Sequence, residues 1–311
     1  MELTHDVPAA YLARHRSDDI RAASQSGGLF TALSDPILAA GGVVYGCAMT
    51  EDFGAAHIRA EDAAARDRMR GSKYIQSRMG DTFRQVRRDL EDGRTVFFTG
   101  TPCQVAGLRG YLRRPYARLF CADLICFGTG SPRIWRAFLR WEEQRHGADI
   151  QEAVFRDKPT FGWRKHMATL RFQDGTSVHS GDYKALYQTA RVLRPSCHVC
   201  PFPGGQRPGD VTMGDFWGVE HTAPAWDDDR GVSLVLVHNE QGRCLLDAAR
   251  DALEGQAIPW DAALQPRLQT PTPRPRSREE LWRRFHAGGF AAVAEKLDRE
   301  RELRKQGIRD Y

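Results

Sequence analysis

Apolar residues in the first half of the chain alternate between helical and strand spacing. A helix is expected over Leu29–Ala40, where Gly41–Gly42 ends it, and the apolar run Val43–Tyr45 indicates a buried strand. A second helix over Asp81–Glu91 precedes the apolar strand Thr95–Thr99. This order of helices and strands predicts an α/β fold built from βαβ units.

The alternation continues with two more helices and a strand. Pro102 is placed to begin a helix through Tyr111, and Leu119–Ile125 is expected to be the next strand. Ser131 then caps a helix that reaches about His146.

The second half of the chain is richer in short strands. A hairpin with its turn at Asp174–Gly175 is expected among Ala153–Arg156, Met167–Phe172 and Thr176–Val178. Two further strands and a helix are expected over Asp210–Met213, Val232–His238 and Glu240–Leu253.

The end of the chain has a different pattern. Pro266–Pro275 is typical of a linker, and Glu279–Gln306 is an amphipathic, Arg/Glu-rich helix of the kind that docks or dimerises. The fold predicted is therefore α/β, with an N-terminal α/β part, a second, strand-rich α+β part and a C-terminal helical tail.

Composition narrows the class of protein. The 311 residues are 41% hydrophobic and 27% charged, ordinary values for a globular chain, which excludes a wholly disordered or collagen-like protein. No apolar run approaches the roughly 20 residues that span a bilayer. The first residues lack the basic and apolar segments of a secretory signal, so we expect a cytoplasmic protein.

The net charge of +5 does not indicate a nucleic-acid partner. The 45 Lys and Arg residues are scattered among 40 Asp and Glu residues, without a basic stripe interleaved with aromatic residues. We therefore expect no nucleic-acid binding.

Seven cysteines in a cytoplasmic chain favour metal or redox chemistry over disulfides. Cys197 and Cys200 form a CxxC motif in a loop, so both thiolates can reach one metal centre. Cys103 and Cys126 each follow a strand, at the sheet edge where sites form in α/β proteins. The four thiolates suffice for Zn²⁺ or for a [4Fe–4S] cluster, and the plainer alternative is a set of unlinked thiols.

The other three cysteines are interpreted as packing residues. Cys121 lies five residues before Cys126, so on a strand it points to the opposite face. Cys47 and Cys244 lie in apolar settings that favour buried small side chains.

Five motifs occur in the order found in a known protein family. They are GSKYIQS, GTPCQVAGL, DLICFG, SCHVCPF and DVTMGDFWG, over Gly71–Ser77, Gly100–Leu108, Asp123–Gly128, Ser196–Phe202 and Asp210–Gly218. From about Ser24 to Leu246 the chain resembles the beta subunit of coenzyme F420-reducing hydrogenase and its relatives, which include formate dehydrogenase beta subunits and a chlorophyll reductase.

The resemblance implies an oxidoreductase that binds FAD in its N-terminal part. It implies one [4Fe–4S] cluster on Cys103, Cys126, Cys197 and Cys200. It also implies family domains over residues 20–110 and 111–262, followed by a linker and helical tail over 263–311. Two features depart from the family: no cysteine precedes Cys47, so a ferredoxin segment is not expected, and Phe127 stands where relatives often have His.

The N-terminal part also carries a pattern that suits a flavin nucleotide. Ser26–Gly28 is a Gly-rich turn that opens a helix, and backbone N–H groups at such a turn bind phosphate. Lys73 is expected beside the flavin, where a cation stabilises the reduced ring, although most lysines are simply surface residues. The expected cofactor-binding residues are Ser26, Gly27, Gly28, Thr31, Lys73, Tyr74, Ser77, Gly100 and Thr101.

Arg156, Trp163 and Lys165 form a second polar and aromatic set in the expected hairpin. Cations beside a flat ring suit a planar or anionic substrate, so these three residues and Lys73 are the expected catalytic residues. A solvated hairpin with a half-buried Trp explains the same pattern.

The leading hypothesis is an oxidoreductase that exchanges hydride and electrons between FAD, one cluster and a small-molecule substrate such as coenzyme F420. One alternative is a non-enzymatic binding module stapled by zinc. Another is an accessory subunit that needs a ferredoxin or another electron-transfer protein as partner. The tail helix offers a surface for a homo-oligomer.

Overall fold

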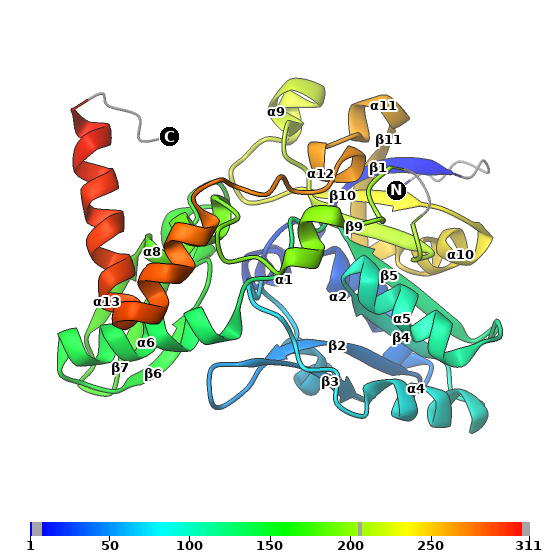
Figure 1. The fold of residues 1–311 in the computed structure, drawn as a ribbon. Coiled ribbons are helices and arrows are strands. Elements are labelled where there is room, and N and C mark those ends of the chain that lie inside the picture. The colour runs from blue at the N-terminus through cyan, green and yellow to red at the C-terminus, as the bar shows by residue number, and fades with distance from the viewer. Residues whose placement is uncertain (2–7, 205–206, 307–311) are drawn as a thin grey trace.

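A mixed sheet of eight strands forms the larger part of the fold (Figure 1). The computed structural model describes residues 1, 8–204 and 207–306. Across the sheet the order is β11-β1-β10-β9-β5-β4-β2-β3. In chain order these strands are β1 Ala9–His15, β2 Val43–Met49, β3 Ala55–Ala60, β4 Val96–Gly100, β5 Leu119–Leu124, β9 Val211–Asp215, β10 Ser233–Val237 and β11 Leu253–Ile258.

The middle of the sheet is parallel and its two ends are antiparallel. β2, β4, β5 and β9 run parallel, whereas β3 pairs antiparallel with β2, and β10, β1 and β11 continue antiparallel beyond β9. The carboxyl ends of the four parallel strands therefore share one edge, where sites form in α/β sheets.

Helices cover both faces of this sheet. α2 (Leu29–Ala39) and α10 (Glu240–Ala248) pack on one face, and α4 (Thr82–Glu91) and α5 (Pro102–Leu112) cover the other face beside β2, β4 and β5. The short helices are α1 Asp18–Ala23, α3 Ala63–Asp67, α7 Lys158–Phe161, α9 Val219–Thr222, α11 Trp260–Ala263 and α12 Pro266–Gln269.

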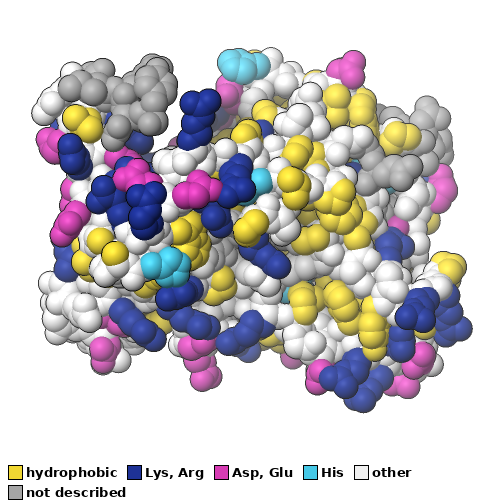
Figure 2. Space-filling model, viewed as in Figure 1, with side chains coloured by type: hydrophobic (Ala, Val, Ile, Leu, Met, Phe, Trp, Pro, Cys, Tyr) yellow, Lys and Arg dark blue, Asp and Glu magenta, His cyan; other side chains and the backbone are white. Residues whose placement is uncertain are grey.

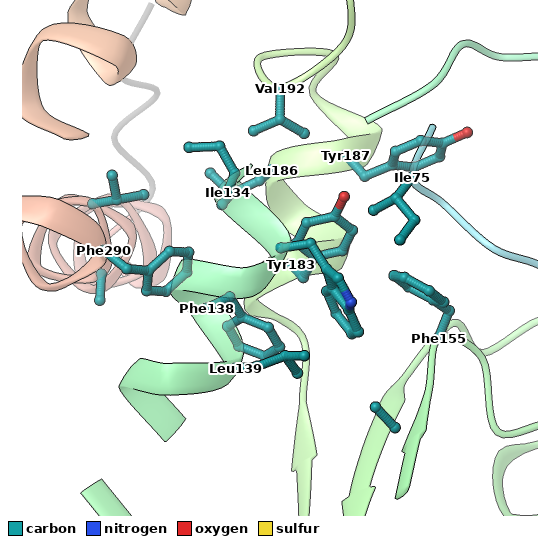
Figure 3. Packing of buried hydrophobic residues seen from close by; sticks show 14 of the residues in the cluster. Ile75, Ile134, Phe138, Leu139, Phe155, Tyr183, Leu186, Tyr187, Val192 and Phe290 are labelled. Carbon is teal, nitrogen blue, oxygen red and sulfur yellow. The ribbon is translucent and has the colours of Figure 1, made fainter. Parts of the chain in front are cut away.

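A second, smaller lobe stands beside the large sheet, at the left of Figure 1. Its antiparallel sheet contains β6 (Ile150–Val154), β7 (Ala168–Phe172) and β8 (Ser177–Ser180). Three helices complete it: α6 Pro132–His146, α8 Asp182–Gln188 and α13 Arg278–Lys305. Its core joins all three helices through residues such as Phe138, Tyr183 and Phe290 (Figure 3).

The predicted α/β fold, with a strand-rich second part and a C-terminal helical tail, is confirmed. The tail helix α13 bends at Gly288–Gly289 and packs its apolar side on α6 of the same chain. No helix of the described residues is long and apolar enough to cross a membrane.

The sequence prediction missed the strands that pair over long distances. β1 lies between β10 and β11, more than 200 residues away in the chain, and neither β1 nor β11 was expected. The expected helix through Leu253 ends at Ala248, because Leu253 begins β11. Strands from both sides of residue 110 share the large sheet, so the expected domain boundary there divides one sheet.

Lys and Arg side chains lie among Asp and Glu side chains over both halves of the face shown in Figure 2. This view shows the charge scatter that the sequence indicated, with acidic and basic groups interspersed.

Candidate functional site

A cavity of about 780 Å³ is lined by residues of both the large sheet and the small lobe. Its volume is in the range of sites for cofactors and small ligands. Eight of the residues expected at a cofactor or cluster line it, namely Ser26, Gly28, Lys73, Tyr74, Ser77, Gly100, Thr101 and Cys126.

The Gly-rich turn opens α2 at one end of this cavity. Gly28 is the N-cap in a left-handed conformation (φ 88°), and no side chain caps the helix there. The first N–H groups of α2, in a segment that lines the cavity with Leu29 and Phe30, therefore have no capping side chain. Such a helix start favours an anion.

Gly27 and Thr31, both expected to bind the cofactor, pack against the protein interior at this turn. A Cβ on Gly27 would lie 2.5 Å from the carbonyl oxygen of Ala13 and 2.8 Å from the amide nitrogen of Ser233, so only glycine fits against the sheet. Thr31 is fully buried, and its hydroxyl accepts a hydrogen bond from Arg70 Nε at 3.0 Å. Neither residue lines the cavity, which corrects the expectation of direct contact.

Lys158 of α7 ties the turn to the small lobe. Its ammonium donates to the carbonyl oxygens of Arg21 (2.5 Å), Ser26 (3.2 Å) and Arg230 (3.0 Å). Burial lowers the pKa of Lys158 to about 8. This buried lysine, which the sequence analysis did not single out, fixes the position of Ser26.

Gln25 lines the cavity beside the turn and was also missed. Its Oε1 accepts a hydrogen bond from the Ser72 amide at 3.4 Å. Its buried Nε2 has no hydrogen-bond partner among the described residues. A buried amide without an acceptor is costly, so this nitrogen points to an acceptor supplied by a ligand.

Lys73 contributes a cation to the cavity wall. Its ammonium donates to the carbonyl oxygens of Met69 (2.8 Å) and Arg70 (2.7 Å), and burial lowers its pKa to about 8. An ammonium has three N–H donors, so one remains for a ligand.

A hydrogen-bonded chain of neutral groups crosses the cavity floor. Gln104 Nε2 donates to the Ser77 hydroxyl at 2.7 Å, and Ser77 lies 3.0 Å from His57 Nδ1. His57 Nε2 lies 3.1 Å from the Thr99 carbonyl oxygen, which can only accept. The proton of the neutral ring is therefore on Nε2, Nδ1 accepts from Ser77, and burial lowers the pKa of His57 to about 4.

The CxxC loop approaches the end of β5 closely at Gly128. This residue has φ 136°, and a Cβ there would lie 2.7 Å from Leu193 Cδ1 and 3.2 Å from Cys197 Cβ. The amide of Thr129 donates to Cys197 Sγ at 3.4 Å. Glycine thus permits the CxxC loop to lie close to the segment that carries Cys126, just beyond β5.

The four expected thiols lie near one another. The pKa of Cys126 responds to Cys103, Cys197 and Cys200, and burial raises it to about 12. Three of the sulfurs have a backbone N–H donor: Cys126 has the Gly128 amide, Cys197 the Thr129 amide and Cys200 the Phe202 amide. The Thr101 hydroxyl lies 3.1 Å from Cys103 Sγ.

No group of three or more His, Cys, Asp or Glu in the described part of the chain is arranged to hold a metal ion, so the ligand role of the four cysteines stays a proposal.

The remaining cysteines take three different positions. Cys121 is fully buried in the core between the sheet and α4 and α5, in agreement with its interpretation as a packing residue. Cys244 is exposed, so its expected burial was wrong. Cys47 is partly buried and packs against the core of the small lobe, as expected, and it also lines the cavity.

Arg156 and Trp163 lie behind the cavity wall. Arg156 donates to Asp215 Oδ2 and Trp163 Nε1 donates to Asp215 Oδ1, both at 2.7 Å. Both side chains are almost fully buried, while Lys165 is exposed over the Phe161 ring. None of the three lines the cavity, so the expected substrate wall is corrected: Asp215, held by this pair, lines it instead.

Comparisons with known proteins agree with this architecture. The family model that describes the C terminus of the coenzyme F420 hydrogenase/dehydrogenase beta subunit matches residues 93–261, which include the four cysteines. A chain in the solved, xenon-derivatised F420-reducing [NiFe] hydrogenase complex from Methanosarcina barkeri has a similar fold, with a TM-score of 0.56 and 17% identity over 92% of this chain and 97% of that chain. No curated protein matches the sequence.

Replacing Gly128 with Ala should displace the CxxC loop. The new Cβ would overlap Leu193, and the positive φ adds strain, so we expect a loss of about 1–3 kcal/mol in the free energy of unfolding. Urea unfolding measures it. Gly110→Ala, in α5 with nothing within 4 Å of its Cβ, is the matched control, and equal losses in both variants would contradict the prediction.

The stability of the protein should fall as the pH drops from about 6.5 to 4. The pKa of His57 is 6.5 when unfolded and about 4 when folded, so in this window the unfolded chain binds more protons. One such histidine costs up to about 1.4 kcal/mol per pH unit, and His166, whose pKa is also lowered to about 4, adds to it. Urea unfolding across this window should show a shallower slope for His57→Gln, and an unchanged slope would refute the assignment.

Proposed function

Because this chain belongs to the family of coenzyme F420 hydrogenase/dehydrogenase beta subunits, we propose that it is a redox subunit whose cavity binds FAD and whose four cysteines hold one [4Fe–4S] cluster. The family to which the sequence motifs pointed is confirmed by the match over residues 93–261. The observation that carries the proposal is that Cys126 belongs both to the cavity wall and to the group of converging thiols.

The cavity suits FAD in its donors and its size. The start of α2 has no capping side chain, which favours the pyrophosphate, and Gln25 Nε2 is a buried donor without an acceptor among the described residues. A third N–H of Lys73 is directed to neither carbonyl. Ser26, Gly28, Tyr74, Ser77, Gly100 and Thr101 complete the proposed contacts.

The four cysteines suit an iron–sulfur cluster. They combine a CxxC pair with two thiols at strand ends, and the Thr101 hydroxyl and three backbone amides lie at the four sulfurs. Hydrogen bonds to cluster sulfurs tune the reduction potential of such centres. This donor set supports Cys103, Cys126, Cys197 and Cys200 as ligands.

When bound, FAD supplies two-electron hydride exchange with a substrate and one-electron exchange with a cluster. The protein would hold these groups in place. Tyr187 stacks on Tyr74 at 4.5 Å between ring centroids, and its hydroxyl donates to the Gly128 carbonyl oxygen at 2.9 Å. These contacts fix the part of the cavity wall next to Cys126.

Asp215 gives the opposite wall a fixed carboxylate. Because Arg156 and Trp163 occupy its two oxygens, its position does not depend on a ligand. We therefore assign Arg156 and Trp163 as positioning residues, and leave contact with ligand to Asp215.

The partners proposed are a small-molecule redox substrate, with coenzyme F420 as first candidate, and an electron-transfer protein or ferredoxin. The similar chain in the Methanosarcina barkeri structure belongs to an F420-reducing hydrogenase complex. An accessory role in a larger complex, a homo-oligomer and a cytoplasmic location stay predictions.

Replacing any one of Cys103, Cys126, Cys197 or Cys200 with Ser should remove most of the iron and sulfide. The protein is purified anaerobically and assayed for iron, sulfide and zinc, with its visible spectrum. Cys244→Ser and Cys121→Ser are the controls and should retain iron.

Two results would overturn the cluster assignment. A colourless protein with about one zinc per chain would support the zinc-stapled binding module instead. Equal iron loss in Cys121→Ser would contradict the assignment of that thiol to the core.

Replacing Lys73 with Met should lower the midpoint potential of bound FAD. A nearby cation favours the reduced, more negative cofactor, and a contact of this kind is worth about 1 kcal/mol or more. Lys73→Arg keeps the charge and should restore most of the potential. An unchanged potential in Lys73→Met, with FAD fully retained, would place Lys73 away from the flavin ring.

A further inference from the structure

The end of the cavity that the small lobe forms contains a cation without a partner in the described chain. Lys184 of α8 lines the cavity together with His166, Gln188 and Trp217. Its ammonium has no hydrogen-bond or ion-pair partner within the part of the chain that the structure describes. A cation half-buried in a cavity wall without a counter-ion favours an anionic ligand.

The charged groups that face Lys184 leave a positive excess. Arg156 and Lys165 both act on it, and with burial they lower its pKa. The Asp215 carboxylate forms an ion pair with Arg156, at 2.7 Å from Asp215 Oδ2 to the guanidinium, and so balances the charge of Arg156 and not that of Lys184. Asp182, on the same helix as Lys184, is held by Arg301.

His166 stands beside this lysine as a neutral donor. Its pKa is lowered to about 4 by burial, by Arg156 and by Lys184. Gln188 Nε2 lies 3.4 Å from His166 Nδ1, an arrangement in which the amide donates and the ring proton is on Nε2. Trp217, stacked at 4.7 Å on Trp163, gives the pair a rigid apolar neighbour.

We propose that Lys184 and His166 bind an anionic group, a phosphate or a carboxylate, of the redox substrate at this end of the cavity. The inference rests on the proposed function and adds a substrate-binding residue pair to it. FAD has donors of its own on the large-sheet side, at the start of α2 and at Lys73. Lys184 comes from the small lobe, so we assign the anion that it binds to the redox substrate and not to FAD.

The experiment measures binding of two deazaflavins to the FAD-loaded protein. One probe is coenzyme F420, whose side chain carries phosphate and carboxylate groups, and the other is the same ring with only the neutral ribityl chain. Lys184→Gln should weaken binding of coenzyme F420 by about tenfold or more and leave the neutral probe within about twofold. Lys184→Arg should recover most of the loss.

Lys165→Gln is the matched control, because it removes a neighbouring positive charge that does not line the cavity. It should weaken the binding of coenzyme F420 by less than about threefold. Equal losses of affinity in the two glutamine variants would overturn the site, because they would show that only the overall positive charge of this region matters. FAD and iron contents are measured in every variant.

The other outcomes separate this inference from the proposed function. Loss of FAD from Lys184→Gln would mean that the lysine binds the phosphates of FAD, and would overturn the substrate site. Failure of the wild-type protein to bind either deazaflavin, with FAD and iron retained, would overturn the substrate site and leave the flavin and cluster assignments standing.

Discussion

The close approach of the CxxC loop to the end of β5 is the constraint on which the site depends. Parallel pairing of β5 with β4 and β9 brings Cys126 to the edge of the large sheet. Gly128 helps the CxxC loop to lie close to that edge, because a Cβ there would overlap the end of the Leu193 side chain and crowd Cys197. Since Cys126 also lines the cavity, the same contact sets the separation between the thiols and any bound ligand. The two proposed redox centres thus meet where the CxxC loop packs against the end of β5.

Contacts between the lobes fix the rest of the cavity. Lys158 reaches from the small lobe to three carbonyl oxygens around the Gly-rich turn, and Arg156 reaches to Asp215 at the end of β9. Both cations are buried, so their hydrogen bonds replace the water that the charged groups lost on folding. Separating the lobes would leave the carbonyl and carboxylate partners of these cations without their hydrogen bonds. This explains why Lys158 and Arg156 face the protein and not the cavity: each makes a contact between the two lobes.

Local patterns predicted much of this fold, and contacts between distant segments account for most of what they missed. The helix at Leu29, the strands that end near Cys103 and Cys126, and the CxxC motif are encoded by neighbouring residues. β1 could not be placed, because its neighbours β10 and β11 lie more than 200 residues away. Arg156 and Trp163 were given the wrong surroundings for the same reason: Asp215, which binds both, is more than 50 residues away in the chain. Gln25, Lys158 and Lys184 are single polar residues whose roles arise only from burial, which sequence spacing does not report.

The cavity combines a neutral floor with cationic ends, and this arrangement follows from how each group is satisfied. His57 stays neutral because burial disfavours the charged ring, while its Nε2–H donates to the Thr99 carbonyl oxygen and its Nδ1 accepts from the Ser77 hydroxyl. Lys73 stays in a buried wall because two carbonyl oxygens share its charge. Lys184 has neither kind of partner in the described chain, and repulsion from Arg156 and Lys165 adds to the cost of burying it. A protein tolerates such a cost where a ligand removes it on binding. The ammonium of Lys184, unpaired among the described residues, therefore marks the place in the cavity where an anionic ligand binds.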